Sequence, residues 1–271
     1  MCGGGAGAYG AGSHGGTGGR GSIAAVPGTY YEPESWGGPG GGDYLEDITS
    51  VDTAGGGSLR IKSVYLTIDT NSSIECNGKS AHVNTLHGGG AGGSVYITTS
   101  SLSGTGSISA VGGSGGTGRN ADVAYGGGGG GGRISIVYDD KSSFVGSFSA
   151  AGGAGGGSAG AGRASAGTIF FISKSDLSGL GTTGGDLLID NSDESVITVD
   201  SLLSTVIRVP SPYFPLSSLS LRNANASIEL PGDKFEVRDI IGDGRSSLHL
   251  NNGTTFWAHS SDISTVDLLT K

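Results

Sequence analysis

The sequence predicts an all-β protein: a right-handed parallel β-helix, that is, a solenoid, with long, packed, glycine-rich loops. Four alternating strands each follow a glycine, and these glycines are 36, 39 and 35 residues apart: Gly57, Gly93, Gly132 and Gly167. A regular spacing of about 20–50 residues indicates a repeat architecture. The chain also contains 57 glycines among 271 residues, and all but four of them lie in residues 1–185, interleaved with the strands.

The first strand of each repeat has apolar residues at alternate positions, as Ile134 and Ile136 illustrate. This alternation places one face of a strand inside the protein and the other outside. The expected strands are residues 58–61, 94–97, 133–137 and 168–172.

A shorter second strand follows in three of the repeats, after a polar turn. The turns are residues 69–73, 103–107 and 144–146, and the second strands are 74–78, 108–112 and 148–152. Each coil therefore reads as strand, tight turn, strand and glycine loop. One coil cannot bury a core alone, but stacked coils can, with equivalent strands paired in parallel. Parallel crossovers are nearly always right-handed, which gives the coil its expected hand.

The glycine loops are too long to be ordinary connections. They cover residues 3–21, 37–42, 112–118, 126–132 and 152–162. Glycine loses more entropy on ordering than any other residue, so ordered loops of this kind need compensating contacts. Extended polyproline-II-like segments packed side by side would supply them, because only glycine permits so close a backbone approach. Irregular ordered loops are the alternative.

Residues 186–271 have a different composition, with few glycines and several short alternating strands. We expect residues 1–185 to form glycine-rich solenoid repeats and residues 186–271 to continue the same solenoid with a more ordinary apolar core. Helix should be almost absent. The expected strands are 186–189, 196–199, 206–209, 219–221, 228–230, 235–237, 248–250 and 255–258.

Residues 92–97, 102–110 and 129–136 have the sequences GGSVYI, LSGTGSISA and GGGGRISI. Their order resembles the glycine-rich β-helix repeats of large secreted proteins of protists, plants and bacteria. The resemblance covers about residues 2–175, and the remainder is similar only in general appearance to pectin-lyase-like coils. It implies an extracellular surface or filament setting and no known activity.

The charge balance excludes several classes of partner. The formal net charge is −9 and the isoelectric point is about 4.9. Nucleic acids and anionic lipid surfaces attract basic proteins, so neither is an expected partner. No run of 18 apolar residues occurs, so we expect no membrane insertion. The chain starts within a glycine run and has no visible signal peptide, so we expect a processed or partial piece of a longer protein.

No catalytic, cofactor-binding or metal-binding residue is expected. The glycine run at 126–132 precedes Arg133 rather than a Lys-Ser/Thr pair, and no helix follows it to cradle a phosphate. The acidic stretches 139–140 and 190–194 lack the spacing of a calcium loop and read as solvated turns. One alternative is a carbohydrate-active enzyme, in which two carboxylates would face a common cleft. Its candidate residues are Glu229, Glu236, Asp239 and Asp243.

Three other groups of residues are candidates for contacts or modification. The aromatic residues Tyr30, Tyr31, Trp36 and Tyr44 lie in an insertion, 27–47, that either forms a contact surface or covers the first glycine layer. The glycosylation triplets at Asn71, Asn225 and Asn252 each fall in an expected turn. Cys2 and Cys76 are either two buried small residues or one disulfide.

These observations predict an extracellular structural glycoprotein. It would be a subunit or segment of a filament, a flagellar hair (mastigoneme-like), a sheath or a surface coat, and it would act by self-association. A solenoid end leaves strand edges that need a cap or a partner, and neither end shows an obvious cap. The alternatives are an adhesin that binds surface glycans or other coat proteins, and the carbohydrate-active enzyme above.

Overall fold

The computed structural model describes residues 29–41, 53–117, 126–156, 163–179, 184–191, 204–208, 216–229, 234–250, 255–259 and 266–270. Within these ranges the protein is almost entirely β, as predicted, and its sheets are mainly parallel. The one helix in this part of the chain, α1 (Lys174–Leu177), has four residues. No helix of the described ranges is long and apolar enough to cross a membrane.

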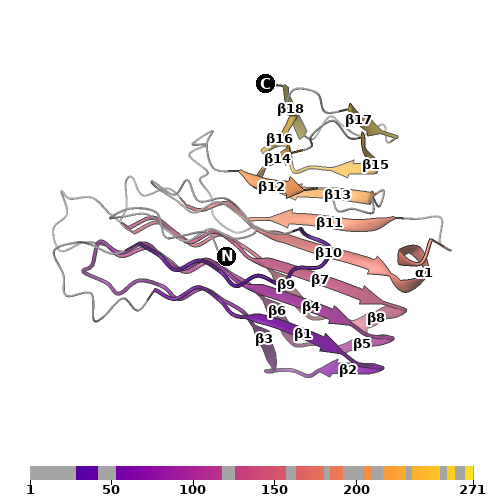
Figure 1. The fold of residues 1–271 in the computed structure, drawn as a ribbon, viewed down its shortest axis with the longest axis horizontal. Coiled ribbons are helices and arrows are strands. Elements are labelled where there is room, and N and C mark those ends of the chain that lie inside the picture. Colours follow the sequence, from indigo (N-terminus) through magenta and orange to yellow (C-terminus); the bar gives the residue numbers. More distant parts are fainter. Residues whose placement is uncertain are drawn as a thin grey trace.

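The largest sheet has eight strands, stacked from β1 at one end of the molecule to β17 at the other (Figure 1). Neighbouring strands in it are parallel except for β10 and β11. In sheet order the strands are β1 (Ser58–Lys62), β4 (Ser94–Thr98), β7 (Arg133–Tyr138), β10 (Thr168–Ser173), β11 (Gly185–Asp190), β13 (Leu216–Arg222), β15 (Lys234–Ile241) and β17 (Thr255–Ala258).

The first three coils each add a strand to two further parallel sheets. One sheet consists of β2 (Tyr65–Ile68), β5 (Ser101–Gly104) and β8 (Asp140–Phe144), and the other of β3 (Ser73–Glu75), β6 (Ser107–Ser109) and β9 (Ser147–Ser149). The sequence predicted only two strands in each coil. It missed the sheet that contains β2, β5 and β8; Ser103 of β5, for example, falls within the expected turn 103–107.

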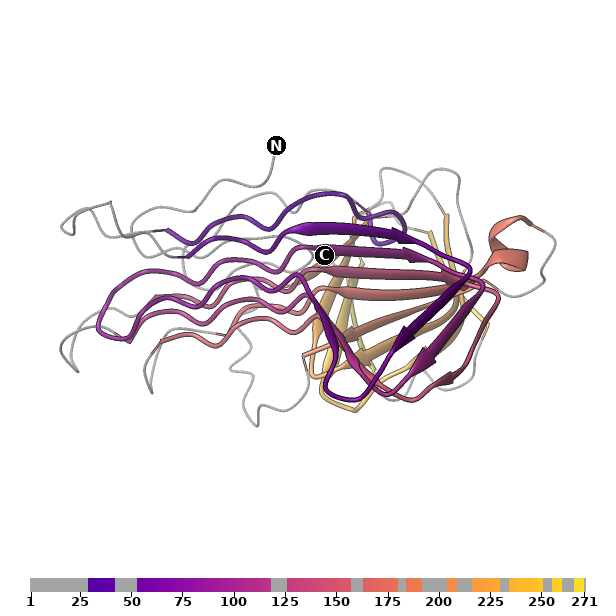
Figure 2. The same ribbon diagram turned by 90° about the horizontal axis from the view of Figure 1, so that it is seen from below.

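Inward residues of equivalent strands form ladders along the stack. Leu59, Val95, Ile134 and Ile169 are successive register partners in β1, β4, β7 and β10. Three of these residues, Val95, Ile134 and Ile169, belong to one buried core cluster. The cluster also includes inward residues of the two smaller sheets, such as Leu102 of β5. Figure 2, seen along the stack, shows the strands of each coil on three sides of this core.

The glycine-rich residues run away from the strands as extended, wavy segments side by side (Figure 2). We call them the glycine slab: residues 37–41, 53–57, 76–81, 87–93, 110–116, 126–132, 150–156 and 163–167. Segment 87–93 shows how they are joined, because its backbone amides donate to three neighbouring segments in turn, each at a step of three residues. The bonds run from Gly88 and Ala91 to Gly41 and Gly38, from Gly89 and Gly92 to Gly127 and Gly130, and from Gly90 and Gly93 to Lys79 and Cys76.

The chain reverses after α1, and this differs from the expectation that residues 186–271 continue the same coils. β11 is antiparallel to β10, with Phe170 opposite Leu187. Beyond β11 the pairing is parallel again, with a four-stranded sheet of β12 (Thr205–Arg208), β14 (Asn225–Glu229), β16 (Ser246–Leu250) and β18 (Val266–Thr270).

The reversal places a second core on the other face of the large sheet. Ile169 belongs to the first core cluster, whereas the adjacent Phe170 belongs to the second, with Leu187, Leu219 and Ile228. Successive side chains of a strand point to opposite faces, so the two cores lie on opposite faces of the large sheet.

Candidate functional site

Within the described residues, the strands of the first coil are unpaired on one side. β1, β2 and β3 are all edge strands in their sheets. The apolar ladders therefore end in partly exposed residues: Leu59 is 37% exposed, whereas its partner Val95 is 0% exposed. Val64 and Tyr65 are also exposed on this coil. An edge of free N–H and C=O groups beside apolar side chains can pair with another strand.

Close packing in the glycine slab explains why its interior residues are glycines. A Cβ on Gly129 would overlap the carbonyl oxygen of Gly90, and a Cβ on Gly153 would overlap that of Gly113. The same holds at most other slab glycines, where the overlapping atom is backbone and cannot move aside like a side chain. The slab is thus a hydrogen-bonded layer of backbone in which a larger residue does not fit at these glycine positions.

Residues 30–36, which we call the crossing segment, lie across the large sheet. Tyr30 packs on Phe170 of β10, and the Tyr31 carbonyl accepts a hydrogen bond from Ser135 Oγ of β7 at 2.6 Å. Glu34 pairs with Arg60 of β1 at 2.8 Å. The segment therefore spans β10 to β1, and these contacts fix its path.

The predicted aromatic contact group is divided by the structure. Tyr30 is 2% exposed and Tyr31 packs against the same core. Burial first, then the nearby charge of Glu32, raises the pKa of Tyr31 to about 12. Trp36 is 66% exposed, and Tyr44 lies outside the described residues. Tyr30 and Tyr31 thus act as cover, over the large sheet rather than over glycines, and Trp36 alone of the described members is available for contacts.

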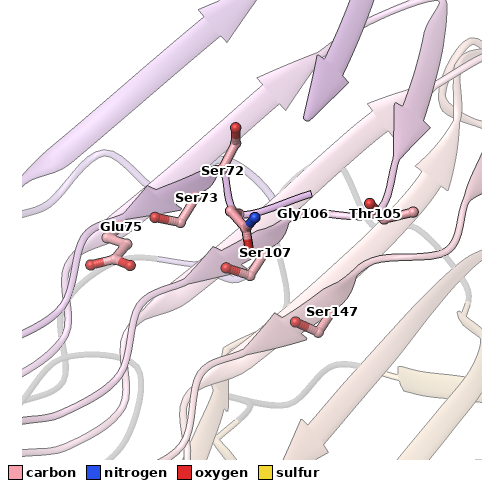
Figure 3. A pocket seen from close by; sticks show the side chains of 8 residues that line it. Ser72, Ser73, Glu75, Thr105, Gly106, Ser107 and Ser147 are labelled. Atoms are coloured by element: carbon pink, nitrogen blue, oxygen red, sulfur yellow. The ribbon is translucent and has the colours of Figure 1, made fainter. Parts of the chain in front are cut away.

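A shallow groove of about 310 Å³ runs beside the turns of the first coils (Figure 3). Ser73, Ser107 and Ser147 are register partners in its wall, so their hydroxyls form a row. Among the described residues that line the groove, Glu75 is the one carboxylate, and a glycoside hydrolase needs a pair of them. Its lining residues are Asn71, Ser72, Ser73, Glu75, Thr105, Gly106, Ser107 and Ser147.

The carboxylates proposed for an enzyme have separate structural partners. Glu236 lies 2.9 Å from Nε2 of His259, and Asp239 lies 3.3 Å from Nε of its neighbour Arg238. Glu229 is on β14, which is not in the sheet of β15.

Asp243 closes a turn after β15. One of its oxygens accepts from the backbone N–H groups of Arg245 and Ser246, at 2.9 and 3.0 Å, and the other accepts from the N–H of Asn223. Burial alone would raise its pKa, but these hydrogen bonds outweigh burial and lower it. Asp243 is therefore held ionised as a turn-closing acceptor.

The acidic stretches predicted as solvated turns also have local partners. Asp139 pairs with Lys174 at 2.8 Å, and this hydrogen bond lowers its pKa. Asp140 accepts from the backbone of Ser142 at 2.8 Å, which lowers its pKa. Residues 192–194 of the second stretch lie outside the described ranges. Within those ranges, no three metal-ligating side chains come together.

The glycosylation triplets differ in accessibility. Asn71 has φ 64° in the turn between β2 and β3, and its side chain is exposed. The prediction of a turn at Asn225 was wrong, because this residue lies in β14. It is 7% exposed there, and its Oδ1 accepts a hydrogen bond from Ser247 Oγ at 2.7 Å. Asn252 lies outside the described residues. Because Asn225 is buried, it is a poor site for attachment of a glycan, whereas glycosylation of the exposed Asn71 stays a prediction.

Cys76 forms no disulfide within the described residues; its sulfur is buried in the first core, and burial raises the pKa of the thiol. Its predicted partner Cys2 lies outside the described residues, so the pairing stays a prediction.

Arg133 is a buried cation that the sequence reasoning missed. It is 2% exposed, and its Nη1 has no hydrogen-bond partner among the described residues. Burial, and then the charge of Arg208, lower its pKa to about 9. The sequence did contain a signal for it. The first residues of the equivalent strands are the small residues Ser58, Ser94 and Thr168, so an arginine at this place stands out.

Comparisons of the chain with protein-family models, with curated proteins and with solved structures gave no match. The resemblance to secreted glycine-rich β-helix repeats therefore stays a prediction from the residues.

Proposed function

We propose that this chain is an extracellular structural protein that acts by self-association, as a subunit or segment of a filament, flagellar hair, sheath or surface coat. The observation that carries the proposal is the glycine slab. Its segments are joined by backbone hydrogen bonds at three-residue steps, and side chains larger than hydrogen are sterically excluded from most of its interior. Such a layer resists deformation but offers few side chains for chemistry, which suits a mechanical part.

The proposal includes a specific architecture, a right-handed parallel β-helix whose glycine segments adopt the polyglycine form of the polyproline II helix. That helix has three residues per turn, so every third amide points toward the same neighbour. The bonding of segment 87–93 fits this period, since residues 88 and 91, 89 and 92, and 90 and 93 address three different segments. The parallel registers of the first three coils fit stacked turns of one helix.

A structural role is also favoured by the positions and partners of the carboxylates considered for a carbohydrate-active enzyme. Glu236, Asp239 and Asp243 have local partners and are not in the described lining of the polar groove, which contains the single carboxylate Glu75. A hydrolase needs two carboxylates on opposite sides of one scissile bond.

Electron cryomicroscopy of material from the surface of the source cells tests this proposal. We expect ordered filaments or arrays containing the chain. Glycopeptide mass spectrometry adds an internal control, because the exposed Asn71 should carry a glycan and the buried Asn225 should not. Recovery of the chain only as dispersed, unglycosylated protein inside cells would overturn the proposal.

A second candidate function, binding of a surface glycan or coat protein, is favoured by Trp36. Its side chain is 66% exposed on a segment whose neighbours are fixed by hydrogen bonds to β4 and β7. Exposed aromatic residues on a rigid support are common in contact surfaces. Trp36→Ala should abolish binding on a glycan array, and Tyr65→Ala, at a residue 80% exposed elsewhere, is the matched control. Equal loss in both variants would refute a Trp36 site.

A further inference from the structure

The open end of the first coil contains a glycine that nothing in the described part of the structure requires. A Cβ on Gly93 would overlap the carbonyl oxygen of Gly57, one on Gly132 that of Gly93, and one on Gly167 that of Gly132. Each of these glycines is therefore needed because the preceding layer lies against it. Gly57 holds the same place in the first coil, yet a Cβ there would meet nothing within 4 Å.

The side chains and strands of this end also lack a preceding layer. Leu59 is 37% exposed, and Ile61, Leu66 and Ile74 are only partly buried. Their register partners in the second coil, Val95, Ile97, Leu102 and Ile108, are all 0% exposed. Glycine at 57, incomplete apolar ladders and unpaired edges are three features of the first coil that one more layer of backbone would complete.

We propose that the open end, formed by Gly57, β1, β2 and β3, is a backbone-stacking surface that binds the open end of a second copy of this chain. This inference rests on the proposed self-association and names its surface. The other end of the molecule finishes in β17 and β18, which belong to sheets of eight and four strands, and it cannot match three sheets. Two open ends do match, and a two-fold axis between them pairs β1 with β1 in antiparallel orientation.

Two charged residues on β1 set the conditions for this pairing. Arg60 is neutralised by Glu34 at 2.8 Å. Lys62 is exposed and has no ion pair within the described part of the chain, so each copy brings an uncompensated positive charge to the paired edge. Lysine on an edge strand opposes pairing, and salt screens that repulsion. Dimerisation should therefore become stronger as the ionic strength rises. It should also be stronger in the Lys62→Ser variant than in the wild type.

Sedimentation velocity over a concentration series, with the full chain, tests the surface. The wild type should form dimers. Gly57→Ala should keep the monomer's thermal stability, since the space is open, but should weaken dimerisation about tenfold or more by placing a methyl group between the stacked backbones. Val145→Ala, at an exposed residue of the loop between β8 and β9, is the matched control and should dimerise as the wild type does.

A monomer at every concentration would overturn the inference, as would dimers or filaments that Gly57→Ala leaves unchanged. The second outcome would place self-association on another face and leave the proposed function standing. Ordered arrays in native material, together with a purified chain that stays monomeric, would likewise refute the proposed stacking surface but not the proposed function.

Discussion

Tyr30 packs edge-on against Phe170, with ring centroids 4.9 Å apart, and so holds the crossing segment on the large sheet. Both side chains belong to the second core, with Leu187 and Leu216. The contact therefore joins a segment that precedes the first coil to the strand where the chain reverses.

Tyr30→Ala should lower the free energy of unfolding by about 3–5 kcal/mol, the usual cost of truncating a large buried aromatic residue. Trp36→Ala should change it by less than about 0.5 kcal/mol, because its side chain is 66% exposed. Urea denaturation followed by circular dichroism measures both. Equal destabilisation would contradict the division of the aromatic group into cover and exposed contact.

Gly129→Ala should destabilise the glycine slab. Its Cβ would overlap the Gly90 carbonyl, while the Gly129 backbone donates to Gly113 and accepts from Gly153. Overpacking costs about 1–3 kcal/mol, and the rigid backbone on all sides places this site at the upper end. Thermal unfolding measures the loss, and amide exchange at Gly153 should accelerate. Gly57→Ala is the control, and an equal loss of stability there would refute steric exclusion as the cause.

Arg133→Met should stabilise the protein at pH 7 by about 1–4 kcal/mol, because it removes a buried charge without an ion pair in the described chain. The folded state lowers the arginine pKa from 12.5 to about 9, so the unfolded chain binds more protons between these values. Wild-type stability therefore rises with pH through this window. In urea denaturation, the excess in free energy of unfolding of Arg133→Met over the wild type should therefore shrink from pH 8 to pH 10.5.

The exposed Arg238→Met is the control and should show no such change with pH. A constant advantage of Arg133→Met across the same range would contradict the buried-charge explanation.

Asp243→Asn should lower the free energy of unfolding by about 1 kcal/mol at pH 7, a modest value because the carboxylate is exposed to solvent. Its folded pKa is lowered, so its contribution is present above the unfolded value, 3.8, and is lost as pH falls through the folded value. The difference from wild type should therefore shrink as the pH falls below 3.8 and vanish below the folded pKa. Asp239→Asn, with one exposed partner, is the control; an equal effect there would contradict the turn-closing role.

Local pattern in the sequence was enough to predict the repeated strands and their parallel pairing. The alternation of Ile134 and Ile136 marks a face that is buried in the structure. The spacing of Gly57, Gly93 and Gly132 marks one place in successive layers, because only glycine allows backbone to pack on backbone there. These features repeat along the chain, so they are visible without knowledge of distant contacts.

Features that depend on distant contacts came only from the tertiary structure. The polar strand β5 resembles a turn until its pairing with β2 and β8 is known. The reversal at β10 and β11 depends on a second core, and the burial of Asn225 depends on its neighbour Ser247 in β16.

The sequence by itself thus determined the period, the alternation and the need for glycine, since these follow from local sterics and hydrophobic pattern. The tertiary structure decided which face of each strand is covered, where Arg133 is buried and which end stays open. Burial and edge exposure are properties of packed neighbours, and those neighbours are far apart in the chain.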